Sequence, residues 1–350
     1  MKIDEIMKDF NKKFKEDLVH QGLAEYEYDR IPFTSPRLTY MTFGGLPMGK
    51  LIEFYGEEHG GKTTTALDVV ANYQILDGAR KVLWVDCENT FDAVWANKLG
   101  VDVESMIMLQ PTNQGAEDIF QFILDMIDTG EIGLVIIDSL GVMVSNQAME
   151  KSVAEKTYGG IAMALTQFSD KAVGLCQRHK CTVVAMNQLR DDLGSMFGGT
   201  KTVGGRGWKH NCSVRLEFRM GKYIDERNKE LTRGAENPAG NIVQVTMKKN
   251  KTCPPTRRLS QYTLKYISGI DFIHDLIDVA IKLNIITGNR WYEIVNIETG
   301  EIISDKIQGL QGVNEFLSDP ANVDILKYIE NTVEANIYND YLQEEDLQEE

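Results

Sequence analysis

The stretch "LIEFYGEEHGGKTTTAL" (51–67) decides the fold. From Gly56 to Thr63 it has the spacing G-x-x-x-x-G-K-T, which is the pattern of a phosphate-binding loop. The apolar run 51–55 before the loop is typical of a β-strand, and the segment 63–77 after it is typical of a helix. Glycines permit backbone dihedrals that turn several N–H groups into one concavity, and the positive end of the helix would face the phosphates. The stretch therefore predicts a nucleotide site.

Two side chains of this loop have separate chemical roles. Lys62 would reach the β- and γ-phosphates, and the hydroxyl of Thr63 would bind Mg²⁺. A chance match in a glycine-rich turn is the alternative, and the strand and helix on either side of the loop argue against it. We therefore expect a nucleoside triphosphate and Mg²⁺ as ligands.

Length and composition describe an ordinary globular protein. The chain has 350 residues, of which 43% are hydrophobic and 25% charged, and it suits two or three domains. It has no uncharged apolar run of the roughly 18 residues that a transmembrane helix needs, and its N-terminus lacks the apolar centre of a secretory signal. Five cysteines without a C-x-x-C pair argue against a disulfide framework or a zinc site and fit a reducing cytoplasm.

The charge is distributed unevenly. The net charge is −15, which by itself argues against nucleic acid, but residues 190–260 hold 15 Lys and Arg against 7 Asp and Glu. This block is therefore locally +8, and the remainder, with 22 bases and 45 acids, is −23. An acidic protein with one basic block could bind a polyanion there. A merely solvated basic face is the alternative that charge alone leaves open.

The organisation along the chain predicts an α/β protein with a doubly wound, mostly parallel sheet. Continuous apolar runs that end in polar residues are typical of buried parallel strands, and helical segments separate them. The expected parallel strands are 81–86, 133–138 and 181–187, with helices near 115–129 and 160–179. Alternating apolar and polar residues predict that antiparallel strands at 213–224 and 241–252 extend the sheet.

Both ends of the chain differ from this core. Residues 2–21 have an apolar stripe that predicts an amphipathic helix, and six acids among the last eleven residues predict a disordered tail. The expected domains are an N-terminal helix and linker (1–34), an ATPase core (35–268), a small C-terminal α+β domain (269–335) and an acidic tail (336–350).

Carboxylates follow two of the expected strands. Asp138 ends the run "LVIIDS" (134–139), where ligand groups collect in parallel sheets and where a second group near Mg²⁺ is expected. Asp86 and Glu88 follow the strand 81–86, and Glu88 could face the γ-phosphate as a general base. The alternatives remain that Asp138 caps a helix and that Asp86 and Glu88 simply begin a loop.

The third strand end and the loop after it indicate a nucleotide-dependent switch. In "AMNQLR" (185–190), an amide beside the γ-phosphate could report whether that phosphate is present. The segment 191–210 has six glycines, one Phe and several bases, which suits a flexible loop that meets phosphates and stacks on bases. An active-site lid is the alternative.

A co-linear set of motifs resembles the RecA family of recombinases. The segments "GGLPMGKLIEFYGEEHGGKTTTAL", "ENTFDAVWANKLGVD", "VIIDSL", "MNQLR", "MFGGTKTVGG" and "KKNKTCPP" have the order and approximate spacing of that family, over about residues 35 to 330. The resemblance implies a RecA-type P-loop ATPase core with a central, mostly parallel sheet, an N-terminal helix that packs on the adjacent protomer, and a small C-terminal α+β domain.

The resemblance also implies roles in ATP binding and hydrolysis at the matching positions. Glu88 would be the catalytic glutamate, Asp138 the Mg²⁺-linked aspartate and Gln188 the γ-phosphate sensor. Lys249 and Lys251 would reach across the subunit interface to a neighbour's ATP. The residues implied to hold ATP are Gly56, Glu57, Glu58, His59, Gly60, Gly61, Lys62, Thr63, Thr64 and Asp138, with Asp92 and Trp95 at the adenine; Trp95 stands where the family usually has Tyr.

Two DNA-binding loops are implied in the same way. The first matches residues 150–160 and the second matches residues 190–205, which is about one residue shorter than usual in the family. The implied DNA-binding residues are Lys156, Gly159 and Gly160 in the first loop, and Arg190, Met196, Phe197, Gly198, Gly199, Thr200, Lys201, Thr202, Gly204, Gly205 and Arg206 in and after the second.

Together these observations predict an ATP-dependent DNA recombinase that forms helical filaments on single-stranded DNA and exchanges strands with homologous duplex DNA. A single-strand-binding protein and loader proteins are further expected partners, and no membrane is. The expected location is the bacterial cytoplasm, with a divergent bacteriophage gene as the expected source. The alternatives are a ring-forming helicase or DNA-translocating ATPase on the same fold, and a RecA-fold switch that does not bind DNA.

Overall fold

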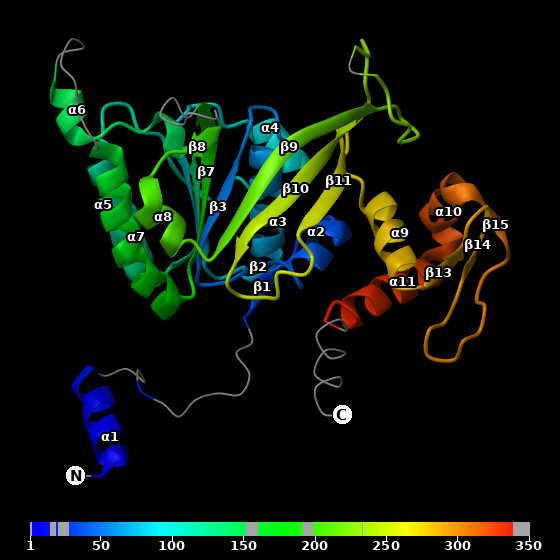
Figure 1. Ribbon diagram of the computed structural model, residues 1–350, viewed down its shortest axis with the longest axis horizontal. Coiled ribbons are helices and arrows are strands. Elements are labelled where there is room, and N and C mark those ends of the chain that lie inside the picture. The colour runs from blue at the N-terminus through cyan, green and yellow to red at the C-terminus, as the bar shows by residue number, and fades with distance from the viewer. Residues whose placement is uncertain are drawn as a thin grey trace.

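The protein is built around one large mixed β-sheet. The computed structural model describes residues 2–14, 19, 28–151, 160–191, 199–232 and 234–338. Strands in the sheet have the order β12-β11-β10-β9-β3-β7-β6-β4-β5, and those from β9 to β5 are parallel to one another. Figure 1 shows the middle of this sheet, with β7, β3, β9, β10 and β11 side by side. The parallel strands are β3 (Leu51–Gly56), β4 (Lys81–Asp86), β5 (Ile107–Leu109), β6 (Ile132–Asp138), β7 (Thr182–Asp191) and β9 (Val214–Ile224).

Antiparallel strands continue the sheet beyond β9. They are β10 (Gly240–Asn250), β11 (Leu259–Lys265) and β12 (Gly269–Ile270). The prediction of a mostly parallel α/β sheet with an antiparallel extension is therefore confirmed. The family resemblance also implied a central, mostly parallel sheet.

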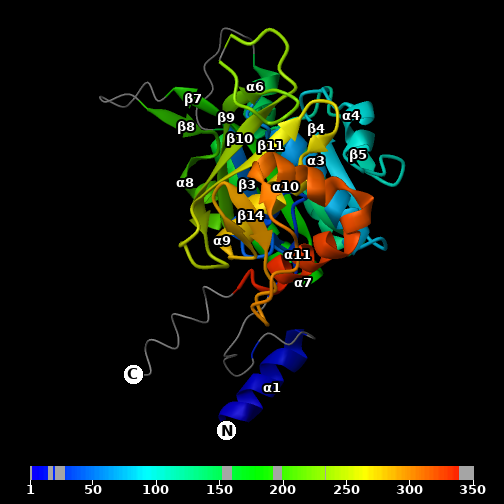
Figure 2. The same ribbon diagram turned by 90° about the vertical axis from the view of Figure 1, so that its right-hand side faces the viewer.

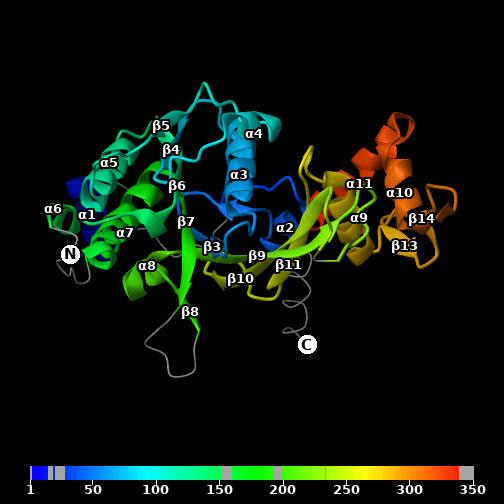
Figure 3. The same cartoon turned by 90° about the horizontal axis from the view of Figure 1, so that it is seen from above.

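Helices cover both faces of the sheet, because neighbouring residues of each buried strand point in opposite directions. In β4, Val82 and Trp84 pack with one face's core, whereas Leu83 and Val85 pack with the other. The helices α3 (Lys62–Leu76) and α4 (Ala93–Lys98) lie on the first face. The helices α5 (Ala116–Asp128), α7 (Gly160–His179) and α8 (Gly205–Asn211) lie on the second face (Figure 3).

Strand β7 is longer than its apolar run predicts. The run 181–187 anticipated its beginning, but the strand continues to Asp191. Its end pairs antiparallel with β8 (Thr200–Thr202), with Leu189 opposite Thr202. Pairing across a long hairpin therefore extends the strand where the sequence itself is polar.

A separate small core lies beyond β11, to the right of the sheet in Figure 1 and in front of it in Figure 2. The helix α9 (Phe272–Lys282) connects it to the sheet. It further contains the strands β13 (Ile286–Gly288), β14 (Trp291–Ile294) and β15 (Ile307–Gln308) and the helices α10 (Gly309–Ser318), η2 (Pro320–Asn322) and α11 (Val323–Ala335). The domain boundaries predicted from the sequence stay predictions.

The remaining elements are short or stand apart. The predicted amphipathic helix is observed as α1 (Ile3–Phe14), which buries none of its residues. The short elements are β1 (Arg30–Ile31), α2 (Pro36–Met41), β2 (Leu46–Pro47), η1 (Leu140–Val142) and α6 (Asn146–Glu150). Residues 339–350, where a disordered tail is predicted, lie outside the described residues. Among the described helices, none has both the length and the apolar character that crossing a membrane requires.

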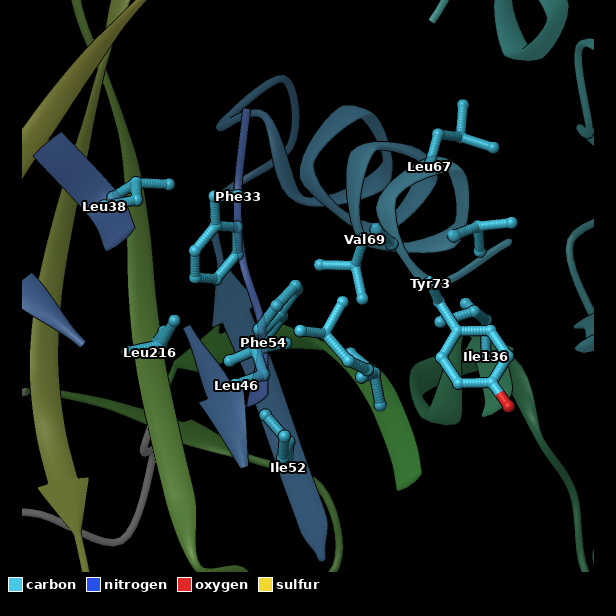
Figure 4. Packing of buried hydrophobic residues seen from close by; sticks show 14 of the residues in the cluster. Phe33, Leu38, Leu46, Ile52, Phe54, Leu67, Val69, Tyr73, Ile136 and Leu216 are labelled. Atoms are coloured by element: carbon cyan, nitrogen blue, oxygen red, sulfur yellow. The ribbon is translucent and has the colours of Figure 1, made fainter. Parts of the chain in front are cut away.

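The strand that leads to the phosphate loop lies in the middle of the first core. Phe54 of β3 is fully buried, and its ring lies 5.0 Å from that of Phe218 in β9. Figure 4 shows Phe54 among side chains of α3 and of the neighbouring strands, with Val69 and Leu216 close by. Packing at Phe54 therefore joins the loop's strand to its helix and to β9.

We expect Phe54→Ala to lower the free energy of unfolding by about 3–5 kcal/mol, because it removes a buried ring from a packed core. Leu259→Ala is the control, since Leu259 is 75% exposed, and it should change stability by less than about 0.5 kcal/mol. Urea unfolding followed by circular dichroism measures both values. Equal stabilities of the two variants would contradict this account of the core.

Candidate nucleotide and DNA site

The phosphate loop connects β3 to α3 in a conformation that needs glycine. Gly61 has a φ of 90° and stands at the N-terminus of α3. Gly56 ends β3, and a Cβ atom there would lie 2.0 Å from the carbonyl oxygen of Phe218. Only glycine fits this close approach to β9. The predicted loop, with a helix N-terminus behind it, is thus observed.

Lys62 is folded into the loop. Its Nζ donates hydrogen bonds to the carbonyl oxygens of Gly56 at 3.0 Å and Glu57 at 2.6 Å. Burial lowers the pKa of Lys62, while the nearby carboxylates of Asp138 and Glu88 oppose that shift. A phosphate group would replace these carbonyl contacts with a charged partner, so the lysine is placed to bind one.

A cleft of about 680 Å³ opens beside the loop, which is large enough for a nucleotide. One wall is formed by residues His59 to Thr64 and by Trp95, whose Nε1 lies 3.4 Å from the Thr64 hydroxyl. The other wall comes from the antiparallel strands and was missed by the sequence analysis. Its residues are Met220, Tyr223, Asn241, Leu264 and Tyr266.

Five residues predicted to hold the nucleotide do not line this cleft: Gly56, Glu57, Glu58, Asp92 and Asp138. The side chain of Asp92 instead caps α4, accepting hydrogen bonds from the backbone N–H groups of Val94 and Trp95. Glu57 and Glu58 are exposed and are also absent from the lining. Trp95 on one wall and Tyr223 and Tyr266 on the other have aromatic rings that could hold a base by stacking.

Thr63 and Asp138 lie together, as a magnesium site of this kind requires. The Thr63 hydroxyl is 3.3 Å from Oδ2 of Asp138. Burial, followed by the nearby charge of Glu88, raises the pKa of Asp138 to about 7. A divalent cation would favour the ionised carboxylate, and Mg²⁺ needs few protein oxygens when phosphates and waters supply the others. The oxygen donors of Thr63 and Asp138 therefore fit Mg²⁺.

Glu88 is held by two hydrogen bonds beside this pair. Its Oε1 accepts one from the Ser139 hydroxyl at 2.6 Å and one from Nε2 of Gln188 at 3.1 Å. The structure thus brings together the predicted base and the predicted sensor, and Ser139 is an additional contact that the sequence analysis missed. Glu88, Ser139 and Gln188 lie together because the strands β4, β6 and β7 end at the same edge of the sheet.

Asp86 has a different role from Glu88. It is buried, and its carboxylate accepts hydrogen bonds from the backbone N–H groups of Thr90 and Phe91, each at 3.1 Å. Nε2 of Gln110 donates a third, also at 3.1 Å. Asp86 therefore organises the loop that carries Glu88, which is the alternative the sequence left open for this residue.

The predicted second DNA loop is bounded by the β7–β8 hairpin. Arg190 contacts the carbonyl oxygen of Gly141, and Thr200 and Lys201 are exposed on β8. Thr202 is only 7% exposed, so its hydroxyl is not displayed on the surface. Gly199 lies at the start of β8, and Gly204, Gly205 and Arg206 lie at the N-terminus of α8, whereas Met196, Phe197 and Gly198 lie outside the described residues.

The first predicted DNA loop ends at the beginning of α7. Gly160 begins α7, whereas Lys156 and Gly159 lie outside the described residues. The helix α7 packs against α8, and a Cβ atom at Gly204 or Gly207 would lie within 2.6 Å of Leu165 or Thr166 respectively. The ends of the two predicted loops are therefore joined by closely packed helices.

The two predicted interface lysines bind the end of α8. Nζ of Lys249 donates to the carbonyl oxygens of Lys209 at 2.7 Å and His210 at 2.8 Å, and Nζ of Lys251 donates to that of His210 at 2.9 Å. Burial, and then the neighbouring charge of Lys251, lowers the pKa of Lys249 to about 8. Cations at a helix C-terminus stabilise its free carbonyl groups.

These lysines lie far from the phosphate loop of the same chain. Asn250 pairs with Val214, which pairs with Ile52 near the beginning of β3, whereas Gly56 ends that strand beside Phe218. Four residues of strand span about 13 Å, so the lysines and the loop stand at opposite edges of the sheet. In this conformation the two lysines do not approach the phosphate loop of their own chain.

Comparison with known proteins agrees with this geometry. A family model described as the RecA N-terminal domain matches residues 1–271. Protein RecA of Ruminococcus albus is 32% identical over 313 residues, which are 89% of this chain and 73% of that protein. Protein RecA of Clostridioides difficile is 33% identical over 298 residues, covering 85% and 79%. Protein RecA of Brucella suis is 30% identical over 295 residues, covering 84% and 76%.

We expect Trp95→Ala to weaken nucleotide binding by roughly 5- to 150-fold, because stacking an aromatic ring on a base contributes about 1–3 kcal/mol. Trp291→Ala is the matched control, since that ring is 51% exposed and does not line the cleft. Titration with a fluorescent ATP analogue measures both affinities. The same affinity for Trp95→Ala and the unaltered protein would show that the base lies elsewhere.

Proposed function

This chain belongs to the RecA family, and from that premise we propose how its residues couple ATP to DNA. Family membership makes it an ATP-dependent recombinase and a DNA-dependent ATPase, which binds nucleotide, binds DNA and assembles into filaments. Nothing in the chain favours the ring-forming helicase. It acts in the recombination and repair of DNA.

In the proposed chemistry, Glu88 is the general base that takes a proton from the attacking water. Lys62 binds the β- and γ-phosphates, and the N-terminus of α3 faces them. Thr63 and Asp138 would hold Mg²⁺, which when bound neutralises charge on the phosphates and the leaving group. Trp95 and Tyr266 are proposed to hold the adenine, whereas Asp92 acts on the nucleotide only through the position of α4.

Gln188 is proposed to report the γ-phosphate to the DNA loop. The observation that carries this proposal is the hydrogen bond of 3.1 Å between Gln188 and Glu88, at the edge of the sheet where the phosphate loop also lies. With a γ-phosphate present, Gln188 would exchange this bond for one to the phosphate and release Glu88. Because Gln188 lies in β7, at the base of the hairpin that bounds residues 190–206, the exchange reaches the loop directly.

Lys249 and Lys251 are proposed to complete the site of a neighbouring protomer. Their place at the far edge of the sheet supports this, since they do not approach the loop of their own chain. On assembly they would leave the carbonyl groups of Lys209 and His210 for the neighbour's γ-phosphate. The helix α8 would lose two cations at its C-terminus, so assembly and the end of the DNA loop would be linked.

The DNA contacts are proposed for the two loops. Arg190, Lys201 and Arg206 would neutralise phosphates, and the exposed backbone near Gly199 and Gly205 would approach the strand closely. Met196, Phe197, Gly198, Lys156 and Gly159 are retained as proposed contacts although they lie outside the described residues. A single-strand-binding protein and loader proteins are proposed as partners, the bacterial cytoplasm as the location, and a bacteriophage as the source.

Glu88→Gln should keep ATP and DNA binding but lower ATP turnover by about 100-fold or more, because only hydrolysis needs the base. Lys62→Ala should instead lose productive ATP binding. Steady-state hydrolysis with single-stranded DNA, together with nucleotide titration, separates the two variants. If Glu88→Gln hydrolyses ATP at the parental rate, Glu88 is not the base.

The interface proposal predicts complementation between two inactive variants. Lys251→Ala subunits carry Glu88, and Glu88→Gln subunits carry Lys251, so random mixing restores both groups at roughly one head-to-tail interface in four. ATP hydrolysis on single-stranded DNA should therefore rise above that of either variant alone. No gain at any mixing ratio would argue that the lysines act within their own chain or have no role.

A further inference from the structure

A polar relay crosses the core of the sheet directly below the nucleotide site. It consists of Glu53 in β3, Asn187 in β7 and Arg215 in β9, three neighbouring strands. Glu53 and Asn187 are fully buried, and the Arg215 side chain is 14% exposed. Arg215 Nε donates to Oε2 of Glu53, and Asn187 Nδ2 donates to Oε1 at 2.8 Å. The buried carboxylate is thus fully partnered.

The amide of Asn187 joins two backbone segments. Its Nδ2 also donates to the carbonyl oxygen of Val203 at 2.9 Å, and its Oδ1 accepts from the backbone N–H of Gln188 at 3.0 Å. Val203 lies between β8 and Gly204, the N-cap of α8, so it is the exit of the proposed DNA loop. One side chain therefore binds the sensor's backbone and the loop's exit together.

Arg215 extends the relay to the strand of the phosphate loop. Its guanidinium lies over the ring of Tyr55, 4.7 Å from the centroid. Tyr55 directly precedes Gly56, and Gly56 pairs with Gln188 across the sheet. The relay therefore contacts the chain just before the phosphate loop, just before the sensor and just after the DNA loop.

An apolar set of similar volume would fill this position without the desolvation that a buried charge pair costs. What it could not do is bind the Val203 carbonyl in one fixed place, because that needs a donor with planar, directed N–H groups. The relay thus fixes the position of Val203 relative to Gln188 more than it adds to the stability of the fold.

We propose that Asn187, held by Glu53 and Arg215, is a positioning residue that fixes the exit of the DNA loop relative to Gln188. It thereby sets how strongly DNA stimulates ATP turnover. The inference rests on the proposed DNA contacts of residues 190–206. Asn187 faces Glu53 on the side of the strand opposite to Gln188 and Glu88, so it has no part in the chemistry itself.

The test compares ATP hydrolysis with and without single-stranded oligonucleotide in the unaltered protein and in Asn187→Ala. We expect DNA-free turnover and its KM for ATP to stay within about twofold, and the stimulation by saturating DNA to fall about tenfold, within the usual range of coupling between sites. Glu53→Gln keeps an acceptor for Asn187 but removes the charge facing Arg215. It should therefore lose less of the stimulation by DNA than Asn187→Ala does. The double variant should lose no more of the stimulation by DNA than Asn187→Ala alone.

Asp275→Asn is the matched control for a general loss of stability. Asp275 is also a fully buried carboxylate that accepts a hydrogen bond from a polar side chain, Ser35, and pairs with an arginine, Arg37, but it lies away from both loops. It should lower the melting temperature comparably while keeping the stimulation by DNA. Equal loss of stimulation in Asp275→Asn and Asn187→Ala would overturn the positioning role.

A second measurement covers the case in which Asn187→Ala does not fold, because Glu53→Gln changes no volume. Hydrogen exchange of residues 203–211 should respond to a non-hydrolysable ATP analogue in the unaltered protein and respond less in Glu53→Gln. An unchanged response, or full stimulation of folded Asn187→Ala, would overturn the inference while the proposed function stands. An unaltered protein that DNA does not stimulate would overturn the proposed function and this inference with it.

Discussion

The hydrogen bond between Gln188 and Glu88 is the interaction on which the rest of the site depends. It exists because the parallel strands β4, β6 and β7 all end at the edge of the sheet where the phosphate loop begins, so side chains about 50 to 100 residues apart meet there. Ser139 holds the same carboxylate oxygen from β6. A carboxylate that accepts both hydrogen bonds is held in one position, and its Oε1 is already occupied. A change at the γ-phosphate could therefore alter both the reactivity of Glu88 and the conformation at the end of β7, while the rest of the sheet stays in place.

The opposite edge of the sheet carries the residues through which we propose that ATP hydrolysis depends on assembly. The cations that the chemistry would use on a neighbour, Lys249 and Lys251, stabilise the C-terminus of α8 within their own chain. The N-terminus of the same helix follows the proposed DNA loop. Val203, just before this helix, accepts a hydrogen bond from the side-chain amide of Asn187. The C-terminus of α8 is thus held by Lys249 and Lys251, which we propose bind a neighbouring protomer. Its N-terminal side is held by Asn187, the residue next to Gln188. ATP, the neighbouring protomer and DNA would therefore all act on α8, a helix of seven residues.

The sequence was sufficient for the elements whose signals are local. The phosphate loop follows from its spacing, and β4 and β6 follow from continuous apolar runs. Contacts made across the fold had no such signal. Tyr266 faces the cleft only because β11 folds back beside β10. The partner of Glu53 is Arg215, 162 positions away, and no local pattern indicates this pairing. The end of β7 is polar and becomes a strand only through pairing with β8. Asp92 fits the family's motif, but its side chain is used locally as a helix cap.

The most direct test of the central claim is an electron cryomicroscopy structure of the protein on single-stranded DNA with Mg²⁺ and a non-hydrolysable ATP analogue. We expect an open helical filament in which Lys249 and Lys251 have left the carbonyl groups of Lys209 and His210 and contact the neighbour's γ-phosphate. Gln188 should have exchanged Glu88 for the same phosphate, with residues 190–206 ordered against the strand. A closed ring, or a filament in which both lysines still bind α8 of their own chain, would contradict the account.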